Sequence, residues 1–355
     1  MNQAGRRRGA RGGAGLSVPL LVSTGALLLT VVFAAGIGTV HVPPGGVLAA
    51  IGRGLAQTIG AAAPGDGATR VADTIVWQIR LPRVVLAATV GAALALAGAA
   101  FQGVFRNPLA DPYLLGAASG AGFAAAAAMV YGAGLPLLGG WGVPVAAFVG
   151  AAATVVVVVA LARRGWSVPV VPLILAGVVI GSSLSAGTSF VLLAAREQAV
   201  GILSWLLGSL TFASWDRLAV AAPLVLVAAV VLLACARGLN VLQLGETSAA
   251  QLGVPVEALK VAVVAAATLA TAAAVSMAGV IGFVGLVVPH AVRLALGPDH
   301  VRLLPVAAIW GAAFLVLADL VARTVISPVE LPVGVVTALV GAPFFLALLR
   351  RRMSA

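Results

Sequence analysis

The amino-acid sequence predicts an all-α polytopic membrane protein with about ten transmembrane helices, and two observations carry this prediction. Of the 355 residues, 62% are hydrophobic and only 9% are charged, whereas about a quarter of the residues in an ordinary soluble domain are charged. The apolar residues also form blocks of about twenty, the length that a helix needs to cross the hydrocarbon core of a bilayer. A β-barrel is not expected, because the alternating segments of such barrels do not occur in the sequence.

Ten apolar blocks, separated by glycine, proline and charged residues, are the predicted spanning helices. They cover residues 16–37, 84–105, 113–132, 144–162, 171–194, 218–236, 261–278, 280–296, 303–322 and 333–349. The first block is longer than the roughly 7–15 apolar residues of a signal peptide, so we interpret it as a retained spanning helix. The block 280–296 is interrupted by Pro289 and by glycines, and we expect it to bend.

The distribution of positive charge predicts the orientation in the membrane. The formal net charge is +11, from 21 basic and 10 acidic residues. An even number of spans puts both termini on one side. With both termini in the cytoplasm, 14 basic residues lie inside: Arg6, Arg7, Arg8, Arg11, Arg106, Arg163, Arg164, Arg237, Lys260, Arg293, Arg302, Arg350, Arg351 and Arg352. The other seven lie outside: Arg53, Arg70, Arg80, Arg83, Arg196, Arg217 and Arg323. Cytoplasmic loops carry an excess of Lys and Arg, so this division supports cytoplasmic termini.

The predicted organisation is a single domain with two short tails. A basic cytoplasmic tail covers residues 1–15, a ten-helix transmembrane domain covers 16–349, and a cytoplasmic C-terminal tail covers 350–355. Small residues recur within the spans, for example Gly91, Gly98 and Gly103 and the pairs Gly116–Gly120 and Gly177–Gly181. Small residues let helix backbones approach closely in lipid, so we expect a compact bundle.

Two polar stretches do not fit the lipid interior. Residues 38–80 are too long and too polar for a simple turn, and they contain a predicted short surface helix over 46–56. Residues 239–259 lie on the predicted inner side, and their apolar residues recur at near-helical spacing, broken at Gly245 and Gly253. This pattern predicts two short amphipathic helices with a glycine between them, lying at the membrane face or against a cytoplasmic partner.

The sequence lacks the motifs of an enzyme. Lys260 is the only lysine and no phosphate-binding glycine loop precedes it, Cys235 is the only cysteine, and the three histidines lie far apart. We therefore expect no catalytic residue and no metal site in this chain. We interpret its basic charge as membrane topology rather than as nucleic-acid binding.

An ion-coupled secondary transporter is a second class that the sequence disfavours. Such carriers need ionisable groups near the middle of the membrane, and the centres of the predicted spans contain no carboxylate. Asp319 lies toward the outer end of its span, four residues before Arg323, at a spacing typical of an internal ion pair. If the protein transports a substrate, the energy is expected to come from another subunit that docks on residues 239–259.

Three arginines are notable on the predicted outer side. Arg80 and Arg83 flank Leu81-Pro82 at the outer mouth of the second predicted span, and Arg323 lies on the same side. We expect Arg80 and Arg83 at the aqueous rim. There they could anchor the protein at lipid headgroups, or, paired with Arg323 on the same face, they could bind carboxylates of an extracytoplasmic partner.

The chain resembles the FecCD permease family, the membrane subunits of ABC importers for iron–siderophore, haem and cobalamin uptake. The resemblance runs from about residue 80 to the C-terminus, whereas residues 1–79 match in layout only. It rests on ordered motifs: RLPR over 80–83, GAALALAGAAFQGVFRNPLADPYLLGAASGAG over 91–122, WLLGSL over 205–210, LQLGETSAAQLGV over 242–254, GVIGFVGLVVPHAVRL over 279–294, and ADLVARTVISPVELPVGVVTALVGAPFF over 318–345.

This resemblance implies the fold of the vitamin B12 importer permease, a ten-helix subunit that dimerises around a central translocation path. Two cytoplasmic ATPase subunits would bind the coupling loop over 239–259, in which the matching residues are Leu242, Leu244, Gly245, Glu246, Ala249, Leu252 and Gly253. A substrate-binding protein outside the cell membrane would dock through its own glutamates onto Arg80, Arg83 and Arg323. The turn Asn107-Pro108-Leu109 matches the inner gate of the family.

The resemblance also implies the cargo and the location. A ferric siderophore is expected first, because most of the family carries one, and cobalamin and haem are the alternatives. The path is expected to be mostly apolar and lined by Ser, Thr and Gly, so substrate choice would rest largely with the binding protein. We expect this chain to bind no cofactor, since ATP would be used by the partner subunit. It would lie among lipids in the cytoplasmic (inner) membrane of a bacterium, paired with a second permease copy or a close paralogue.

Overall fold

The structure is all-α, as the sequence predicts. The computed structural model describes residues 14–38, 40–60, 71–132, 136–195 and 197–353. Within these ranges the backbone forms helices and turns but no β-strand. Almost all of the predicted basic tail over 1–15 lies outside the described residues, and so do Arg70 and Arg196.

The helices of the described residues agree with the ten predicted spans. In chain order they are α1 (Ala14–Gly36), α2 (Pro44–Thr58), the π-helical η3 (Thr74–Arg80), α4 (Leu81–Val104), α5 (Ala117–Tyr131), the short η4 (Pro136–Trp141), α6 (Gly142–Ala162), α7 (Val170–Ala194), α8 (Ala199–Leu206), α9 (Trp215–Ala234), α10 (Ala236–Leu242), α11 (Glu246–Gln251), α12 (Val256–Ala278), α13 (Val284–Leu296), α14 (His300–Thr324) and α15 (Val333–Met353). Among them, seven helical segments are long and apolar enough to cross a membrane: α1, η3 with α4, α6 with the end of η4, α7, α9, α12 and α14. Three shorter apolar helices, α5, α13 and α15, correspond to the remaining predicted blocks.

The second spanning helix begins earlier than predicted. η3 and α4 belong to one continuous helix over Val71–Val104, so Arg80 and Arg83 lie within a spanning helix rather than in front of one. Pro82 does not end this helix, because a wide π turn precedes it, in which the Leu81 N–H donates to the Val76 carbonyl five residues earlier. The changed hydrogen-bond register accommodates the missing N–H and the ring of the proline.

Two predicted blocks are helical over only part of their length. Residues 107–116 form turns, so α5 begins at Ala117 rather than at 113. α13 begins only at Val284, because Gly279 (φ +71°) and Phe283 (φ +70°) both adopt left-handed backbone conformations. A side chain at Gly279 would also overlap the Trp205 carbonyl. The expected irregularity of the block 280–296 is confirmed, but it lies at the start of the block and not at Pro289.

The two polar stretches form the predicted short helices. α2 covers the predicted helix over 46–56 and has Pro44 in its first turn, a position that proline favours. α10 and α11 lie at the predicted inner loop, and the turn between them is at Gly245, whose φ of +106° favours glycine. The eight-residue helix α8 is an addition, since a segment so short produces no spanning block in the sequence.

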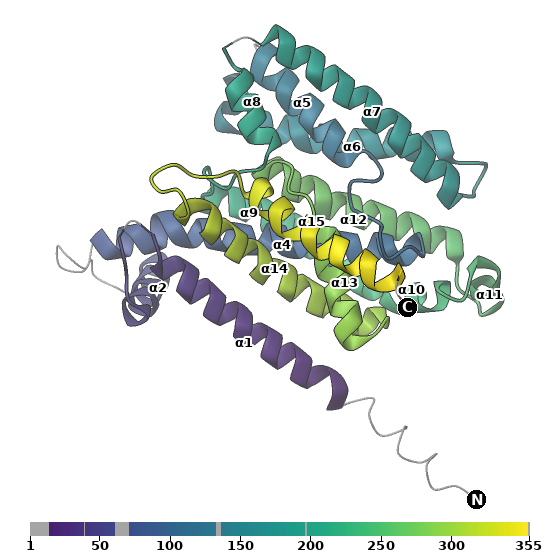
Figure 1. Ribbon diagram of the computed structural model, residues 1–355, viewed down its shortest axis with the longest axis horizontal. Helices are drawn as coiled ribbons and strands as arrows, with labels where there is room; N and C mark the ends of the chain where they lie inside the picture. The colour runs from purple at the N-terminus through teal and green to yellow at the C-terminus, as the bar shows by residue number, and fades with distance from the viewer. Residues whose placement is uncertain (1–13, 39, 61–70, 133–135, 196, 354–355) are drawn as a thin grey trace, which may run out of the picture.

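α4 and α12 lie at the centre of the bundle (Figure 1). α4 packs against α12, α13 and α14, and α12 packs also against α6 and α9. α5, α6 and α7 form a second layer that joins the rest mainly through the contact of α6 with α12. The spanning helices differ in the buried share of their most apolar stretch. This share is 78% in the helix Val71–Val104 and 72% in α12, but only 17% in α1 and 17% in α7. The two central helices are therefore core elements, and α1 and α7 present most of their surface outward.

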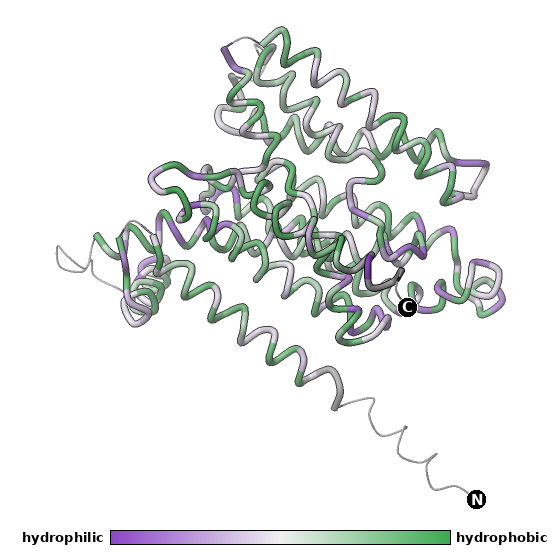
Figure 2. The backbone as a smooth tube through the Cα atoms, viewed as in Figure 1, coloured by the Kyte–Doolittle hydropathy of each residue, from purple (hydrophilic) through white to green (hydrophobic). Residues whose placement is uncertain are grey.

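The polar residues gather at the two ends of the bundle (Figure 2). α2 lies at one end, and α10 and α11 lie at the other (Figure 1). α15 ends near α10, and α1 begins toward the same end. This arrangement is the one expected for an even number of spans.

Three helix crossings are built on pairs of glycines. The pairs are Gly91–Gly311 between α4 and α14, Gly98–Gly285 between α4 and α13, and Gly120–Gly150 between α5 and α6. In each pair, a Cβ atom on the first glycine would overlap the backbone carbonyl of the second. Helices in lipid associate by close packing rather than by a hydrophobic drive, and small residues make that packing possible. The predicted packing role of Gly91, Gly98 and Gly120 is confirmed.

The substitution Gly98→Ala is expected to destabilise the protein, because the added methyl group pushes α4 away from α13. Overpacking of this kind costs about 1–3 kcal/mol. The measurement is the midpoint of thermal unfolding in detergent, followed by gel filtration. Gly25→Ala in α1 is the matched control, since no atom lies within 4 Å of a Cβ at that position. Equal midpoints for the two variants would contradict a structural role for the glycine crossing.

Candidate functional site

The first candidate region is the coupling segment, which we define as residues 236–255: α10, α11 and the turn after each. Of its predicted contact residues, Leu242 and Ala249 are fully buried and hold the segment against the bundle. Leu244 and Leu252 instead project outward, with 66% and 64% of their surfaces exposed. Large exposed apolar side chains on a short segment between spanning helices are candidates for a contact surface.

Two glycines and a cluster of ion pairs fix the shape of the coupling segment. Gly245 (φ +106°) and Gly253 (φ +82°) form the turns after α10 and α11. The Glu246 carboxylate lies 3.1 Å from Lys260 Nζ, which also lies 2.7 Å from the Glu257 carboxylate. Because the Lys260 side chain is only 1% exposed, these pairs anchor α11 to α12. The predicted site does not include Lys260. Its status as the only lysine in the sequence is a feature that could have identified it.

Side-chain hydrogen bonds attach α10 to the ends of two spanning helices. Asn240 Oδ1 accepts a hydrogen bond from the backbone N–H of His300 in the first turn of α14 (2.7 Å), and Asn240 Nδ2 donates to Asp299 (2.6 Å). Gln243 Nε2 donates to the Gly103 carbonyl near the end of α4 (2.9 Å). A displacement of the coupling segment would therefore be transmitted directly to α4 and α14.

The predicted gate turn, Asn107-Pro108-Leu109, lies just beyond the same end of α4. The Asn107 side chain accepts a hydrogen bond from the Leu109 N–H (3.0 Å), an arrangement typical of Asx turns. Gln102 supports the turn, because its Nε2 donates to the Ala110 carbonyl (3.3 Å) while its Oε1 accepts from Arg293 Nη1 (2.8 Å). The gate turn and the coupling segment are thus bonded to neighbouring residues of α4, Gln102 and Gly103. Gln102 and Arg293 are additions to the predicted site.

A serine-lined groove of about 540 Å³ lies between residues 111–116, α5 and α7. Ser119, Ser182 and Ser185 line it together with glycines, which is the composition expected for the translocation path. Removal from water raises the pKa of the Asp111 carboxyl to about 6, although the Tyr113 N–H donates to it (2.8 Å). In the part of the chain that the structure describes, no three His, Cys, Asp or Glu side chains are grouped so that they could hold a metal ion.

At the opposite end of the bundle, Arg80 is not at the aqueous rim, and the expectation that it is exposed is wrong. The Arg323 side chain is also largely buried. Arg80 is only 6% exposed, and its Nη1 donates to the carbonyls of Ala35 and Gly36 (both 3.1 Å). Arg323 donates to the Ala34 carbonyl. These carbonyls end α1 and have no later helical turn to bond to. The two arginines therefore cap the C-terminus of α1, where positive charge is favoured.

Arg83, Asp319 and Glu330 form an ion-pair network beside this cap. Arg83 Nε and Nη2 lie 3.0 and 2.8 Å from Asp319 Oδ1, and Arg83 Nη1 lies 2.9 Å from Glu330 Oε2. Asp319 is only 1% exposed and also lies 3.7 Å from Arg323 Nε. The predicted internal pair of Asp319 with Arg323 is confirmed. The sequence could not show that Arg83, more than two hundred residues away along the chain, is the closer partner of Asp319.

Both a family profile and individual proteins match this chain over most of its length. The sequence profile of the FecCD transport family matches residues 26–351. The cobalamin import system permease protein of Halobacterium salinarum is 48% identical over 298 residues, which is 84% of this chain and 79% of that protein. The hemin transport system permease protein of Yersinia pestis is 42% identical over 280 residues, which is 78% of this chain and 84% of that protein.

A solved structure also matches the fold. It is described as an inward-facing conformation of a metal-chelate type ABC transporter and is 31% identical to this chain. The two superpose with a TM-score of 0.80 over 94% of this chain and 98% of the other. The predicted all-helical permease fold is therefore confirmed.

The substitution Asp319→Asn is expected to destabilise the fold, because it leaves two largely buried guanidinium groups without their central carboxylate. Removing one partner of a buried pair costs about 3–5 kcal/mol. Glu330→Gln is the matched control, since this carboxylate is 39% exposed and exposed pairs contribute at most about 1 kcal/mol. Thermal unfolding in detergent measures both. A similar loss in the two variants would show that burial of Asp319 is not what makes the network stabilising.

Proposed function

The chain belongs to the FecCD transport family, and on this basis we propose that it imports a metal chelate as the permease subunit of an ABC importer. It is a multi-pass membrane protein and not an enzyme. In this proposal, separate ATPase subunits hydrolyse ATP and a substrate-binding protein delivers the chelate. The observation that carries the proposal is the coupling segment, which exposes two leucines and is bonded to the ends of α4 and α14.

The coupling segment is the proposed contact for the ATPase subunits. Leu244 and Leu252 offer exposed apolar side chains that a partner could bury, and apolar anchors of this kind supply much of the energy of protein interfaces. The Lys260 pairs hold the segment to α12. An anchored segment supports the proposal because movement of the ATPase subunits would then move the spanning helices instead of bending a loose loop.

The serine-lined groove and the gate turn are the proposed parts of the translocation path that this chain contributes. The groove offers serine hydroxyls, backbone and a single carboxylate, that of Asp111. In the described part of the chain no three His, Cys, Asp or Glu side chains are grouped to hold a metal ion, which suits a chelate whose metal is already coordinated. Asn107 and Leu109 are exposed beside it, so a movement of the turn could open or close the inner end. A second copy of the chain, or a close paralogue, would supply the other wall.

The end of the bundle that carries Arg83 is the proposed docking surface for the binding protein. A glutamate of that protein could replace or join Glu330 on Arg83 Nη1, which lies at the exposed edge of the network. Arg80 and Arg323 would act indirectly, by fixing the end of α1. This end would face outward and the coupling segment would face the cytoplasm, with the chain in the cytoplasmic membrane of a prokaryote.

We propose cobalamin as the first chelate to test. The names of two relatives support a metal held in a tetrapyrrole-type ring, cobalamin at 48% identity and hemin at 42%. The ferric siderophore that the sequence favours remains the second candidate, because a serine-lined path with a single carboxylate would also pass a preformed iron chelate.

The double substitution Leu244→Ala with Leu252→Ala is expected to weaken the ATPase contact at least about tenfold, since it removes both exposed anchors. The measurement is co-purification and affinity of the ATPase subunit for the detergent-solubilised permease. Leu294→Ala on α13 is the control, because this leucine is equally exposed (66%) but lies outside the coupling segment. Unchanged affinity in the double variant would argue against the proposed contact.

Uptake by proteoliposomes tests the transport class and the cargo together. Permease reconstituted with its ATPase and binding protein is expected to accumulate cobalamin only when ATP is supplied on the side of the coupling segment. Haem and a ferric siderophore are offered in parallel. Uptake that continues without ATP would favour an ion-coupled carrier, and uptake of the siderophore alone would overturn the choice of cobalamin.

A further inference from the structure

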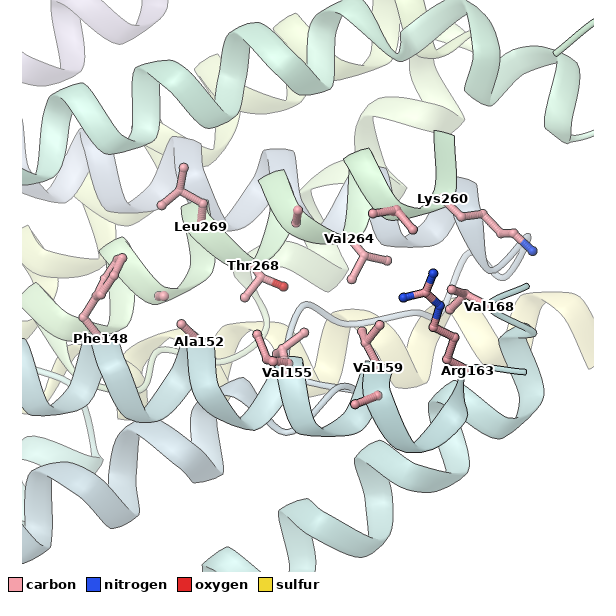
Figure 3. Close-up of a pocket in the computed structure, with 15 residues that line it drawn as sticks. Phe148, Ala152, Val155, Val159, Arg163, Val168, Lys260, Val264, Thr268 and Leu269 are labelled. Carbon is pink, nitrogen blue, oxygen red and sulfur yellow. The ribbon is translucent and has the colours of Figure 1, made fainter. Parts of the chain in front are cut away.

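The groove between α6 and α12 takes no part in the transport function proposed above. It has a volume of about 470 Å³. Apolar side chains line most of its length, among them Phe148 and Val155 on α6 and Val264 on α12 (Figure 3). A long, narrow apolar lining on a multi-pass membrane protein fits a hydrocarbon chain better than a polar solute.

One end of this groove is basic. Arg163 rises there from α6, across the groove from Lys260 (Figure 3). Arg163 donates to the Gly165 carbonyl (2.7 Å) and stacks over the exposed ring of Trp166. Within the described residues it has no carboxylate at ion-pair distance. A tryptophan beside an arginine at the end of a spanning helix is typical of the headgroup level of the membrane.

The other charges at this end do not cancel Arg163. Lys260 is paired with Glu246 and with Glu257, and the Glu257 carboxylate also accepts a hydrogen bond from the Val168 N–H. This end of the groove therefore has three basic groups, Arg163, Arg164 and Lys260, and two carboxylates, those of Glu246 and Glu257. Because both carboxylates pair with Lys260, the excess positive charge lies on the Arg163 side. Basic pockets between spanning helices on the cytoplasmic side are sites for anionic lipid headgroups.

A second, independent feature is an unpartnered hydroxyl inside the groove. The Thr268 side chain lines it, Thr268 is 8% exposed, and its Oγ1 has no hydrogen-bond partner among the described residues. Thr271 on the same helix instead donates to the Ala267 carbonyl (2.7 Å), the usual bond for a threonine in a helix. Thr268 lies one helical turn beyond Val264, about 6 Å further from the basic end. A buried hydroxyl without a partner is costly, and an acceptor on a bound molecule would satisfy it.

We propose that this groove binds one anionic phospholipid of the surrounding membrane. Its phosphate bonds to the Arg163 guanidinium, one acyl chain lies along the apolar lining, and an ester carbonyl accepts a hydrogen bond from Thr268 Oγ1. The site is next to the coupling segment, because Lys260 contributes both to the groove and to the ion pairs that hold α11.

The experiment is native mass spectrometry of the purified full chain titrated with dioleoylphosphatidylglycerol. One lipid is expected to remain bound, and Arg163→Ala is expected to weaken it about tenfold, the effect of losing a charge-assisted hydrogen bond. Arg164→Ala is the matched control, since it removes the same charge from the next residue, which does not line the groove. Equal affinities of the two variants would overturn the proposal, and so would binding of dioleoylphosphatidylcholine as tight as that of the anionic lipid.

Two further variants test the groove and the hydroxyl separately. Ala152→Phe fills the groove and is expected to abolish the bound lipid, whereas Ala153→Phe, on the exposed side of α6, is expected to leave it in place. Thr268→Val is expected to weaken binding several-fold without lowering the unfolding midpoint. Inorganic phosphate at millimolar concentration is expected not to compete, and competition would assign Arg163 to a free anion instead. Lipid retained by Ala152→Phe would overturn the acyl-chain assignment.

Discussion

The contact of backbone with backbone at glycines is the constraint on which the rest of this structure depends. Inside a bilayer, apolar side chains gain nothing by leaving lipid for another helix, so helices hold together where their surfaces fit closely. α4 meets that condition twice, at Gly91 against α14 and at Gly98 against α13. These two crossings fix the rotation of α4 about its axis. Gln102 and Gly103 lie about one helical turn further along α4. The rotation of α4 therefore sets the direction in which these two residues meet their hydrogen-bond partners, Ala110 and Gln243.

α4 connects the two ends of the molecule. With η3 it belongs to a continuous helix of 34 residues, which at 1.5 Å per residue is about 51 Å long and exceeds the hydrocarbon thickness of about 30 Å. One end carries Arg80 and Arg83, which bind α1 and α14. The other end carries Gln102 and Gly103, which bind the gate turn and the coupling segment. A central helix attached in this way connects the coupling segment to the gate turn and to the far end of the bundle.

The charged residues show how the same side chain can serve structure and function. Arg80 and Arg323 satisfy the final carbonyls of α1, and Asp319 holds Arg83 and Arg323 together at the end of the bundle. A family resemblance at these positions therefore has two explanations, docking and architecture. The geometry assigns the architectural role to Arg80 and Arg323, and of the three arginines only Arg83 pairs with an exposed carboxylate, that of Glu330. Lys260 is the parallel case at the opposite end, since it orders the coupling segment and also borders the groove between α6 and α12.

The sequence by itself determined the membrane class, the ten apolar helices, the short helices of the coupling segment and the glycines that pack. Each of these follows from local composition and periodicity, which do not depend on what lies far away in the chain. The tertiary structure alone decided which charges are buried and that Arg83 pairs with Asp319. It also decided that Pro82 lies within a continuous helix after a π turn, and that the Thr268 hydroxyl has no hydrogen-bond partner among the described residues. Those outcomes depend on contacts between residues up to hundreds of positions apart, and a linear pattern contains no information on which polar groups are brought together when the helices cross.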